Sequence, residues 1–205
     1  MKKRFAIFAV AAALSASGVH AQSASSWEIG PVINGRSYSP GMPRTMSDGS
    51  RGPTFQFPTS EREGHVHYVT RAVGSLSEAQ RITLRYRIDA GQGARFIPRE
   101  RPEETALLSM YFQRRGDTWQ ADRAYGDYRW YAAAPVSLRP GTHTVTVEMR
   151  ADDWIPVSRS GSDDFATARA MAGRAGFTFG WRGGRGHGVY ATAPAQFTLL
   201  SFEID

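Results

Sequence analysis

The chain has 205 residues, with 25 Lys and Arg against 19 Asp and Glu, a formal net charge of +6 and no cysteine. Without cysteine the chain has neither disulfides nor a lipid attached to an N-terminal cysteine. Residues 1–21 contain three of the basic residues, so the remaining 184 residues carry 22 basic and 19 acidic side chains. A net charge of +3 is not the balance of a nucleic-acid-binding domain, and the length is enough for one domain with a substantial core.

Residues 1–21 have the pattern of a secretory signal peptide. Lys2, Lys3 and Arg4 form a positive start, an apolar run follows from Phe5 to Leu14, and Val19 to Ala21 matches a small-residue cleavage site. The apolar run is shorter than the roughly 20 residues that span a bilayer. We therefore expect an exported protein, periplasmic or secreted, with no transmembrane segment in the mature chain.

Residues 22–60 are rich in Ser, Gly and Pro but carry large apolar side chains at both ends, including Trp27, Ile29, Phe55 and Phe57. A disordered tail has no need of these side chains, so we predict an N-terminal arm that packs on a domain formed by residues 61–205.

Two stretches of that domain have clear strand patterns. Arg81 to Asp89 alternates apolar and polar residues, which predicts a strand with one face in the core. Ala106 to Gln113 is apolar at nearly every position, which predicts a strand buried on both faces. Further strands are expected at His65 to Thr70 and Ala195 to Ile204.

The stretch from Tyr128 to Trp154 predicts the central hairpin of the domain. Tyr128 to Tyr131 favours a strand, Thr142 to Met149 alternates, and Pro140-Gly141 between them is typical of a tight turn.

A short helix is expected from about Asp163 to Ala172, with Ser162 as its N-cap and Gly173 and Gly176 ending it. Two short strands, Gly176 to Trp181 and His187 to Thr192, should flank a glycine-rich loop.

Eight or nine strands, one short helix before the last strands and Gly/Pro turns indicate an all-β fold. We predict a two-sheet β-sandwich with jelly-roll topology, and a lipocalin-like barrel is the alternative.

The C-terminal half resembles the galactose-binding-domain-like jelly rolls of carbohydrate-binding modules and of accessory domains in secreted bacterial enzymes. The residues that carry the resemblance are Tyr111 to Asp117, Tyr128 to Tyr131, Leu138 to His143, Gly186 to Tyr190 and Phe197 to Leu199. The resemblance implies the sandwich fold and a carbohydrate or cell-envelope ligand, but it specifies no binding residue.

Aromatic side chains near polar loops are the first candidates for binding a sugar, because flat apolar sugar faces pack on aromatic rings. The chain offers Trp119, Trp130, Tyr131, Trp154 and Trp181. Each of them is also explained by core packing. Trp119 and Trp181 are preferred because both adjoin polar or glycine-rich loops.

The loop from Arg182 to Gly188 is the second candidate. Arg182, Arg185 and His187 in a flexible glycine backbone suit a carboxylate, a sulfate or a hydroxyl-rich ligand. We expect this loop to project from one end of the sandwich. A hairpin loop that needs glycine for positive φ explains the same residues.

Metal and catalytic motifs are weak. His65 and His67 share a strand face without a third ligand in sequence, so no metal site is predicted. A structural calcium bound by Asp152, Asp153, Asp163 or Asp164 matches no EF-hand loop. No Gly-x-Ser-x-Gly motif is present, and a carboxylate pair such as Asp117 with Asp127 cannot be recognised from spacing.

The sequence therefore favours a non-catalytic exported protein that binds a glycan. The alternatives are an envelope module that binds a protein partner through the arginine face of Arg81 to Asp89, and a carbohydrate-active hydrolase or lyase.

Overall fold

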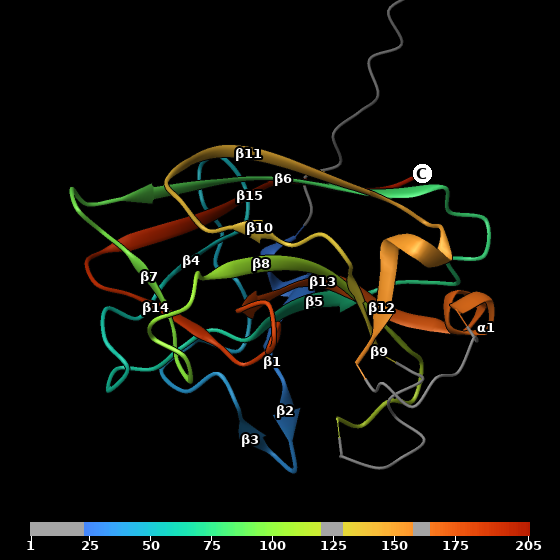
Figure 1. The fold of residues 1–205 in the computed structure, drawn as a ribbon, viewed down its shortest axis with the longest axis horizontal. Helices are drawn as coiled ribbons and strands as arrows, with labels where there is room; N and C mark the ends of the chain where they lie inside the picture. Colours follow the sequence, from blue (N-terminus) through green and yellow to red (C-terminus); the bar gives the residue numbers. More distant parts are fainter. Residues whose placement is uncertain (1–22, 120–128, 158–164) are drawn as a thin grey trace, which may run out of the picture.

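The fold is a sandwich of two antiparallel sheets, as the sequence predicts (Figure 1). The computed structural model describes residues 23–119, 129–157 and 165–205. The predicted signal peptide, the proposed helix cap Ser162 and the acidic residues Asp127, Asp163 and Asp164 lie outside these ranges.

One layer is a seven-stranded sheet. Its strands in spatial order are β1 (Trp27–Gly30), β5 (Tyr68–Ala72), β13 (Ala172–Gly180), β8 (Leu107–Arg114), β9 (Arg129–Ala132) and β12 (Trp154–Pro156), with β10 (Val136–Ser137) paired to β8 beyond the end of β9. The other layer is a four-stranded sheet of β11 (Gly141–Glu148), β6 (Arg81–Ala90), β15 (Ala195–Ile204) and β4 (Thr54–Gln56).

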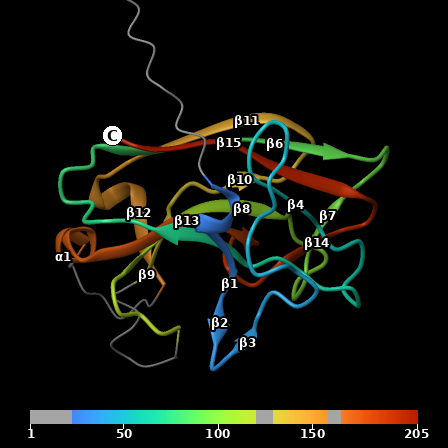
Figure 2. The same ribbon diagram turned by 180° about the vertical axis from the view of Figure 1, so that it is seen from behind.

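The remaining elements are short. Strand β14 (Val189–Ala191) pairs with β7 (Phe96–Pro98), and β2 (Val32–Ile33) pairs with β3 (Arg36–Ser37) in a hairpin that projects from the body in both ribbon views (Figures 1 and 2). The helical segments are η1 (Ala24–Ser26), η3 (Ala151–Asp153) and α1 (Phe165–Ala170).

The core fills the space between the two sheets. Strand β6 alternates as predicted, with Ile82, Leu84, Tyr86 and Ile88 buried. Strand β8 is buried on both faces, also as predicted, because the sandwich covers one face and further residues cover the other. Aromatic rings join the layers: Phe177 of β13 stacks on Phe197 of β15 at 5.0 Å between ring centroids.

The topology is of the jelly-roll kind, because the chain crosses repeatedly between the two sheets. Strands β4, β6, β11 and β15 belong to one sheet, and between each consecutive pair of them the chain forms at least one strand of the other sheet. No strand of the described residues pairs across the two sheets, so the lipocalin-like barrel is wrong.

The predicted central hairpin is also wrong. Strand β9 pairs with β8 and β12, whereas β11 pairs with β6 in the other sheet. The Pro140-Gly141 corner is therefore a crossover between the layers. Gly141 still has the positive φ that the turn chemistry predicts, +117°.

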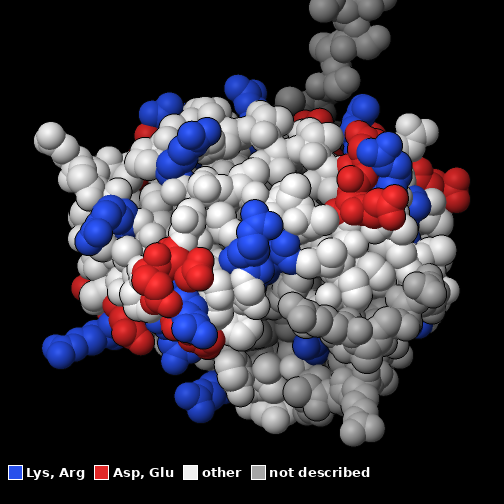
Figure 3. Space-filling view, viewed as in Figure 1, with Lys and Arg blue, Asp and Glu red and all other residues white. Residues whose placement is uncertain are grey.

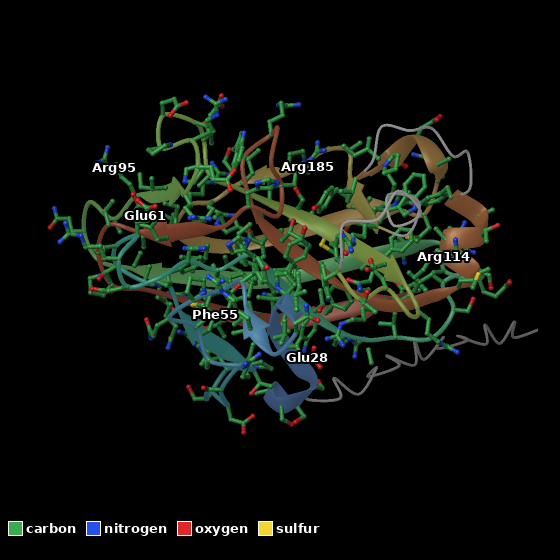
Figure 4. All side chains as sticks on the ribbon, turned by 90° about the horizontal axis from the view of Figure 1, so that it is seen from below. Glu28, Phe55, Glu61, Arg95, Arg114 and Arg185 are labelled. Carbon is green, nitrogen blue, oxygen red and sulfur yellow. The ribbon has the colours of Figure 1, made fainter. Side chains whose placement is uncertain are left out.

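Helix α1 is confirmed as a short helix, but its predicted end is not. Ala172, Gly173 and Gly176 belong to strand β13, so the chain passes from helix to strand without a glycine stop. The ring of Phe165 packs on Trp130 at 5.2 Å and anchors α1 to the end of the core. Figure 4 places Arg114, the last residue of β8, beside α1.

Residues 23–60 contribute strands to both sheets. Strand β1 pairs with β5 and strand β4 pairs with β15. Trp27 is fully buried and Phe55 is 3% exposed, because both side chains enter the space between the sheets. Trp130 and Trp154, two of the five tryptophans, are core residues as well, and this removes them from the candidate ligand site.

The surface carries charges of both signs side by side, and the face seen in Figure 3 has acidic and basic clusters separated by uncharged surface. On the outer side of β6, Arg81 pairs with Asp205 at 3.1 Å and Arg87 with Asp89 at 2.6 Å, so much of the arginine face is neutralised. In the part of the chain that the structure describes, no helix is long and apolar enough to cross a membrane.

Candidate functional site

The outer face of the seven-stranded sheet holds a second aromatic cluster, separate from the core. Tyr68 of β5, Tyr111 of β8 and Tyr131 of β9 point to this face because Val69, Phe112 and Trp130, their neighbours in sequence, point into the core. Tyr111 is fully buried, and Tyr68 and Tyr131 are each 8% exposed. We call these three residues the tyrosine cluster.

Hydrogen bonds satisfy the phenol groups of the tyrosine cluster. The hydroxyls of Tyr68 and Tyr131 bond to each other, and the Tyr111 hydroxyl donates to Oε1 of Gln113 at 2.8 Å. Burial raises the pKa of all three tyrosines above the usual value, so they stay neutral near pH 7. The tyrosine cluster is therefore a rigid, uncharged aromatic surface on which other residues pack.

Trp119 covers the tyrosine cluster. Its indole lies 4.7 Å from the ring of Tyr68 and stacks within 15° of parallel on Tyr111, and it remains half-buried. Its φ is +67°, a left-handed conformation that bulky residues rarely adopt. Strain of this kind persists only where the surrounding structure fixes it, and it is concentrated at functional sites.

A buried ion pair holds Trp119 in this conformation. Asp117 accepts the backbone N–H of Trp119 at 2.8 Å and binds Arg129 with both carboxylate oxygens, at 2.6 and 2.7 Å. The Asp117 side chain is fully buried and that of Arg129 is 14% exposed. The guanidinium carbon of Arg129 lies 5.3 Å from the centre of the Trp119 ring, so the pair and the indole form one unit. From sequence alone, Asp117 is a candidate only as one member of a carboxylate pair with Asp127.

The loop from Trp181 to Gly188 does not project from the sandwich, contrary to the prediction. Gly184, Arg185, Gly186 and Gly188 are buried, because the loop folds back onto the outer face of the seven-stranded sheet. A Cβ at Gly186 would lie only 2.0 Å from the Tyr68 hydroxyl, so the missing side chain is what permits this approach.

Arg185 is therefore a buried residue. It is 9% exposed, its Nη2 donates to the carbonyl of Ala133 at 3.0 Å, and its Nε is buried without a hydrogen-bond partner among the described residues. Burial, followed by the charge of Arg182, lowers its pKa. Figure 4 labels Arg185, which belongs to this loop.

The other three loop candidates remain at the surface. Trp181 is half-buried and its ring lies 5.1 Å from that of His187, whose Nδ1 is 2.9 Å from Oε2 of Glu100. Arg182 is exposed. These side chains form a polar patch around one partly exposed indole.

Tyr68 links the two groups of candidate residues. Trp119 packs against its ring, and Gly186, next to Arg185 and His187, packs against its hydroxyl. The structure thus places Trp119 and the 181–188 loop on the same face of the seven-stranded sheet. Sequence reasoning named Tyr131 among the aromatic candidates, but it missed Tyr68, Tyr111 and Arg129 as parts of the same site. Only the side-chain parity along β5, β8 and β9 indicates that these residues share a face.

His65 and His67 lie next to this loop, buried, with ring centroids 4.6 Å apart. The Nδ1–H of His67 donates to the carbonyl of Gly186 at 2.8 Å. No group of three or more His, Cys, Asp or Glu side chains placed to hold a metal occurs among the described residues. Of the proposed calcium ligands, Asp153 pairs with Arg150 at 3.0 Å.

Stability should fall as the pH drops below about 6.5, because both imidazoles are buried neutral. Burial lowers the pKa of His65 to about 4, with a further contribution from Arg99, and burial lowers that of His67 to about 3, with a further contribution from the neighbouring His65. The unfolded chain takes up these protons near pH 6.5, so their contribution is complete above that value and is lost between about pH 6.5 and 3.

For His67 alone, we expect a loss on the order of 3 kcal/mol between pH 7 and 4, measured by urea unfolding. His67→Gln should show a smaller loss over this interval, whereas His187→Gln, which changes an exposed ring, should show the wild-type loss. Equal pH slopes for wild type and His67→Gln would contradict the assignment.

The fold and this face together define a two-sheet β-sandwich that carries an aromatic surface site. No protein-family model matches the chain, and no curated protein matches it.

Among solved structures, the chain is similar to the xylan-binding module CBM15, with 14% identity over 86% of this chain and 92% of that one and a TM-score of 0.40. It is also similar to a mutant Xylanase10C from Cellvibrio japonicus in complex with xylopentaose, with 13% identity over 86% of this chain and 27% of that one and a TM-score of 0.38. A third is CtCBM11, with 12% identity over 88% of this chain and 99% of that one and a TM-score of 0.33.

The resemblance to carbohydrate-binding modules that the sequence indicates is thus also found among solved structures. With every TM-score below 0.5, this likeness says nothing about the ligand or the site. The sandwich class rests on the strand pairing described above.

Proposed function

We propose that this chain is an exported, non-catalytic protein that binds a carbohydrate on the outer face of its seven-stranded sheet. The observation that carries the proposal is Trp119, a half-buried indole held at a positive φ of +67° over a buried aromatic base. A rigid aromatic plane of this kind suits the apolar face of a sugar ring, and fixing it before binding reduces the entropy lost on binding.

Polar groups around the platform suit the hydroxyls of a sugar. Arg129, which is 14% exposed, lies beside Trp119, and Arg182 and His187 lie near Trp181 on the other side of Tyr68. Small-molecule sites usually have this composition, with a few polar groups placed around an apolar surface. Export to the periplasm or the medium is part of the proposal and rests on the pattern of residues 1–21.

The test is affinity electrophoresis of residues 22–205 against a panel of neutral and acidic polysaccharides. Trp119→Ala should weaken binding of the retained polysaccharide by about 30-fold or more, since central tryptophans commonly contribute 2 kcal/mol or more to binding. Tyr38→Ala, which removes an aromatic ring that is 45% exposed and packs against Arg36 outside the platform, should bind like wild type.

Melting curves should show that both variants are folded at the assay temperature. If no polysaccharide retards the wild-type protein, or if Trp119→Ala and Tyr38→Ala bind equally well, the proposal is wrong.

A further inference from the structure

A cavity of about 450 Å³ lies at the open edge of the sandwich, between β10 and β11. In Figure 1, β10 lies between the levels of β11 and β8. The cavity is lined by Tyr86, Val136, Ser137, Arg139, Thr142, His143, Thr144 and Val145. None of these residues belongs to the Trp119 platform or the 181–188 loop, and the volume is within the range of small-molecule sites.

The lining is rich in hydrogen-bond donors and contains no acidic side chain. Tyr86 and Ser137 carry hydroxyls, and the positive charge comes from Arg139, whereas Thr142 and Thr144 are exposed and alternate along β11 with His143 and Val145. In the part of the chain that the structure describes, no carboxylate lies within 4.0 Å of the Arg139 guanidinium. An exposed arginine at the rim of a cavity without acidic groups is available to an anion.

Tyr86 supplies an unpartnered polar group beside this cavity. Its side chain is fully buried, its ring stacks on Phe197 at 5.1 Å, and its hydroxyl has no hydrogen-bond partner among the described residues. Burial raises the pKa of Tyr86 to about 12, and the charge of Arg139 acts in the opposite direction. The hydroxyl is therefore protonated near pH 7. A buried hydroxyl without a hydrogen-bond partner lowers the free energy of unfolding by about 1–3 kcal/mol. A ligand atom that accepts a hydrogen bond from it would recover part of this free energy.

His143 fixes the turn that carries Arg139. It lies opposite Tyr86 in the β11–β6 register, with the two ring centroids 5.1 Å apart. Its Nε2–H donates to the carbonyl of Arg139 at 3.0 Å, which leaves Nδ1 as an acceptor. The turn is tied back onto β11, so Arg139 is held at the rim of the cavity.

We propose that this cavity is a second binding site, for a small organic carboxylate no larger than about one sugar ring. Arg139 pairs with the carboxylate, and the hydroxyls of Tyr86 and Ser137 form hydrogen bonds with the oxygen atoms of the ring. The apolar sides of Val136 and Val145 contact the carbon skeleton. This site is independent of the carbohydrate platform on the other sheet.

The experiment is isothermal titration of residues 22–205 with D-glucuronate, D-glucose and sulfate, with ¹H–¹⁵N NMR to locate the shifts. We expect glucuronate to bind at least 10-fold more tightly than glucose or sulfate and to shift the amides of residues 136–145. Absence of glucuronate binding, equal binding of glucose, or equal binding of sulfate would each overturn the proposal.

Two variants localise the site. Arg139→Gln should weaken glucuronate binding at least 10-fold, whereas Arg85→Gln, which changes an exposed arginine on the outer face of β6, should not. Tyr86→Phe should weaken binding several-fold while leaving the melting temperature unchanged or higher, because it removes a buried hydroxyl that has no partner. Equal binding by the two arginine variants would refute the site, and a Tyr86→Phe protein that melts lower but binds normally would show a structural hydroxyl instead.

Discussion

Replacement of Gly176 by alanine is expected to lower the free energy of unfolding by about 3 kcal/mol or more. Gly176 lies in the middle of β13, paired with Thr70 of β5 on one side and Tyr111 of β8 on the other. A Cβ at this position would lie 2.1 Å from the Val69 carbonyl oxygen and 2.8 Å from the Thr70 Cα. Both atoms belong to the backbone of a paired strand, which cannot move aside as a flexible side chain can, so the cost is at the upper end for overpacking.

Urea unfolding of Gly176→Ala and of Gly74→Ala provides the measurement and its control. A Cβ at Gly74 meets no atom within 4 Å, and this variant should stay within about 0.5 kcal/mol of wild type. If Gly176→Ala is too unstable to purify while Gly74→Ala is normal, the expectation also holds. A Gly176→Ala protein as stable as Gly74→Ala would show that β5 and β13 can separate here.

The strands could be predicted from the sequence where one physical signal dominates. In β6 the alternation of apolar and polar residues is uninterrupted, and each apolar side chain enters the core. In β8 an unbroken apolar run signals burial on both faces. These patterns depend only on which side of a strand meets water, which is a local property.

Strand pairing could not be predicted in the same way. Strands β9 and β11 both have strand-forming sequences and are joined by a segment with good turn residues, yet they belong to different sheets. Alternation along β11 shows that Val145 and Val147 are buried but not that β6 is the partner. The partner is set by the packing of the whole sandwich.

The candidate site was predicted only in its parts. Trp119 was chosen because it stands in a polar loop, but its strained backbone and its tyrosine base depend on contacts between distant strands. The position of residues 182–188 between two short strands predicts a loop that projects from one end of the sandwich. Its glycines instead let the loop approach the sheet closely, since a Cβ at Gly180 would overlap the Gly184 carbonyl oxygen and one at Gly186 would overlap the Tyr68 hydroxyl.

Asp117→Asn is the substitution expected to affect both stability and ligand binding. Asp117 has no exposed side-chain surface and forms two hydrogen bonds to Arg129, which is 14% exposed. The amide removes the negative charge and leaves the guanidinium buried without its counter-ion. Breaking a buried ion pair by changing one partner typically costs 3–5 kcal/mol, so we expect a loss of about 3 kcal/mol in the free energy of unfolding.

The same change should weaken carbohydrate binding even where the protein is fully folded. The two Asp117 oxygens accept from Arg129 and from the backbone N–H of Trp119, and an amide, with one acceptor oxygen and an NH2 group facing these donors, cannot keep all three bonds, so the positive φ of Trp119 loses support. Asp89→Asn is the matched control, because Asp89 also forms ion pairs, with Arg51 and Arg87, but its side chain is 36% exposed. Exposed ion pairs contribute little to the free energy of unfolding. Urea unfolding should show a much larger loss for Asp117→Asn than for Asp89→Asn, and affinity electrophoresis below the melting range should show weaker retardation only for Asp117→Asn. Equal losses of stability would mean that solvent reaches the Asp117–Arg129 pair, and normal retardation of the destabilised variant would mean that the tyrosine cluster alone positions Trp119.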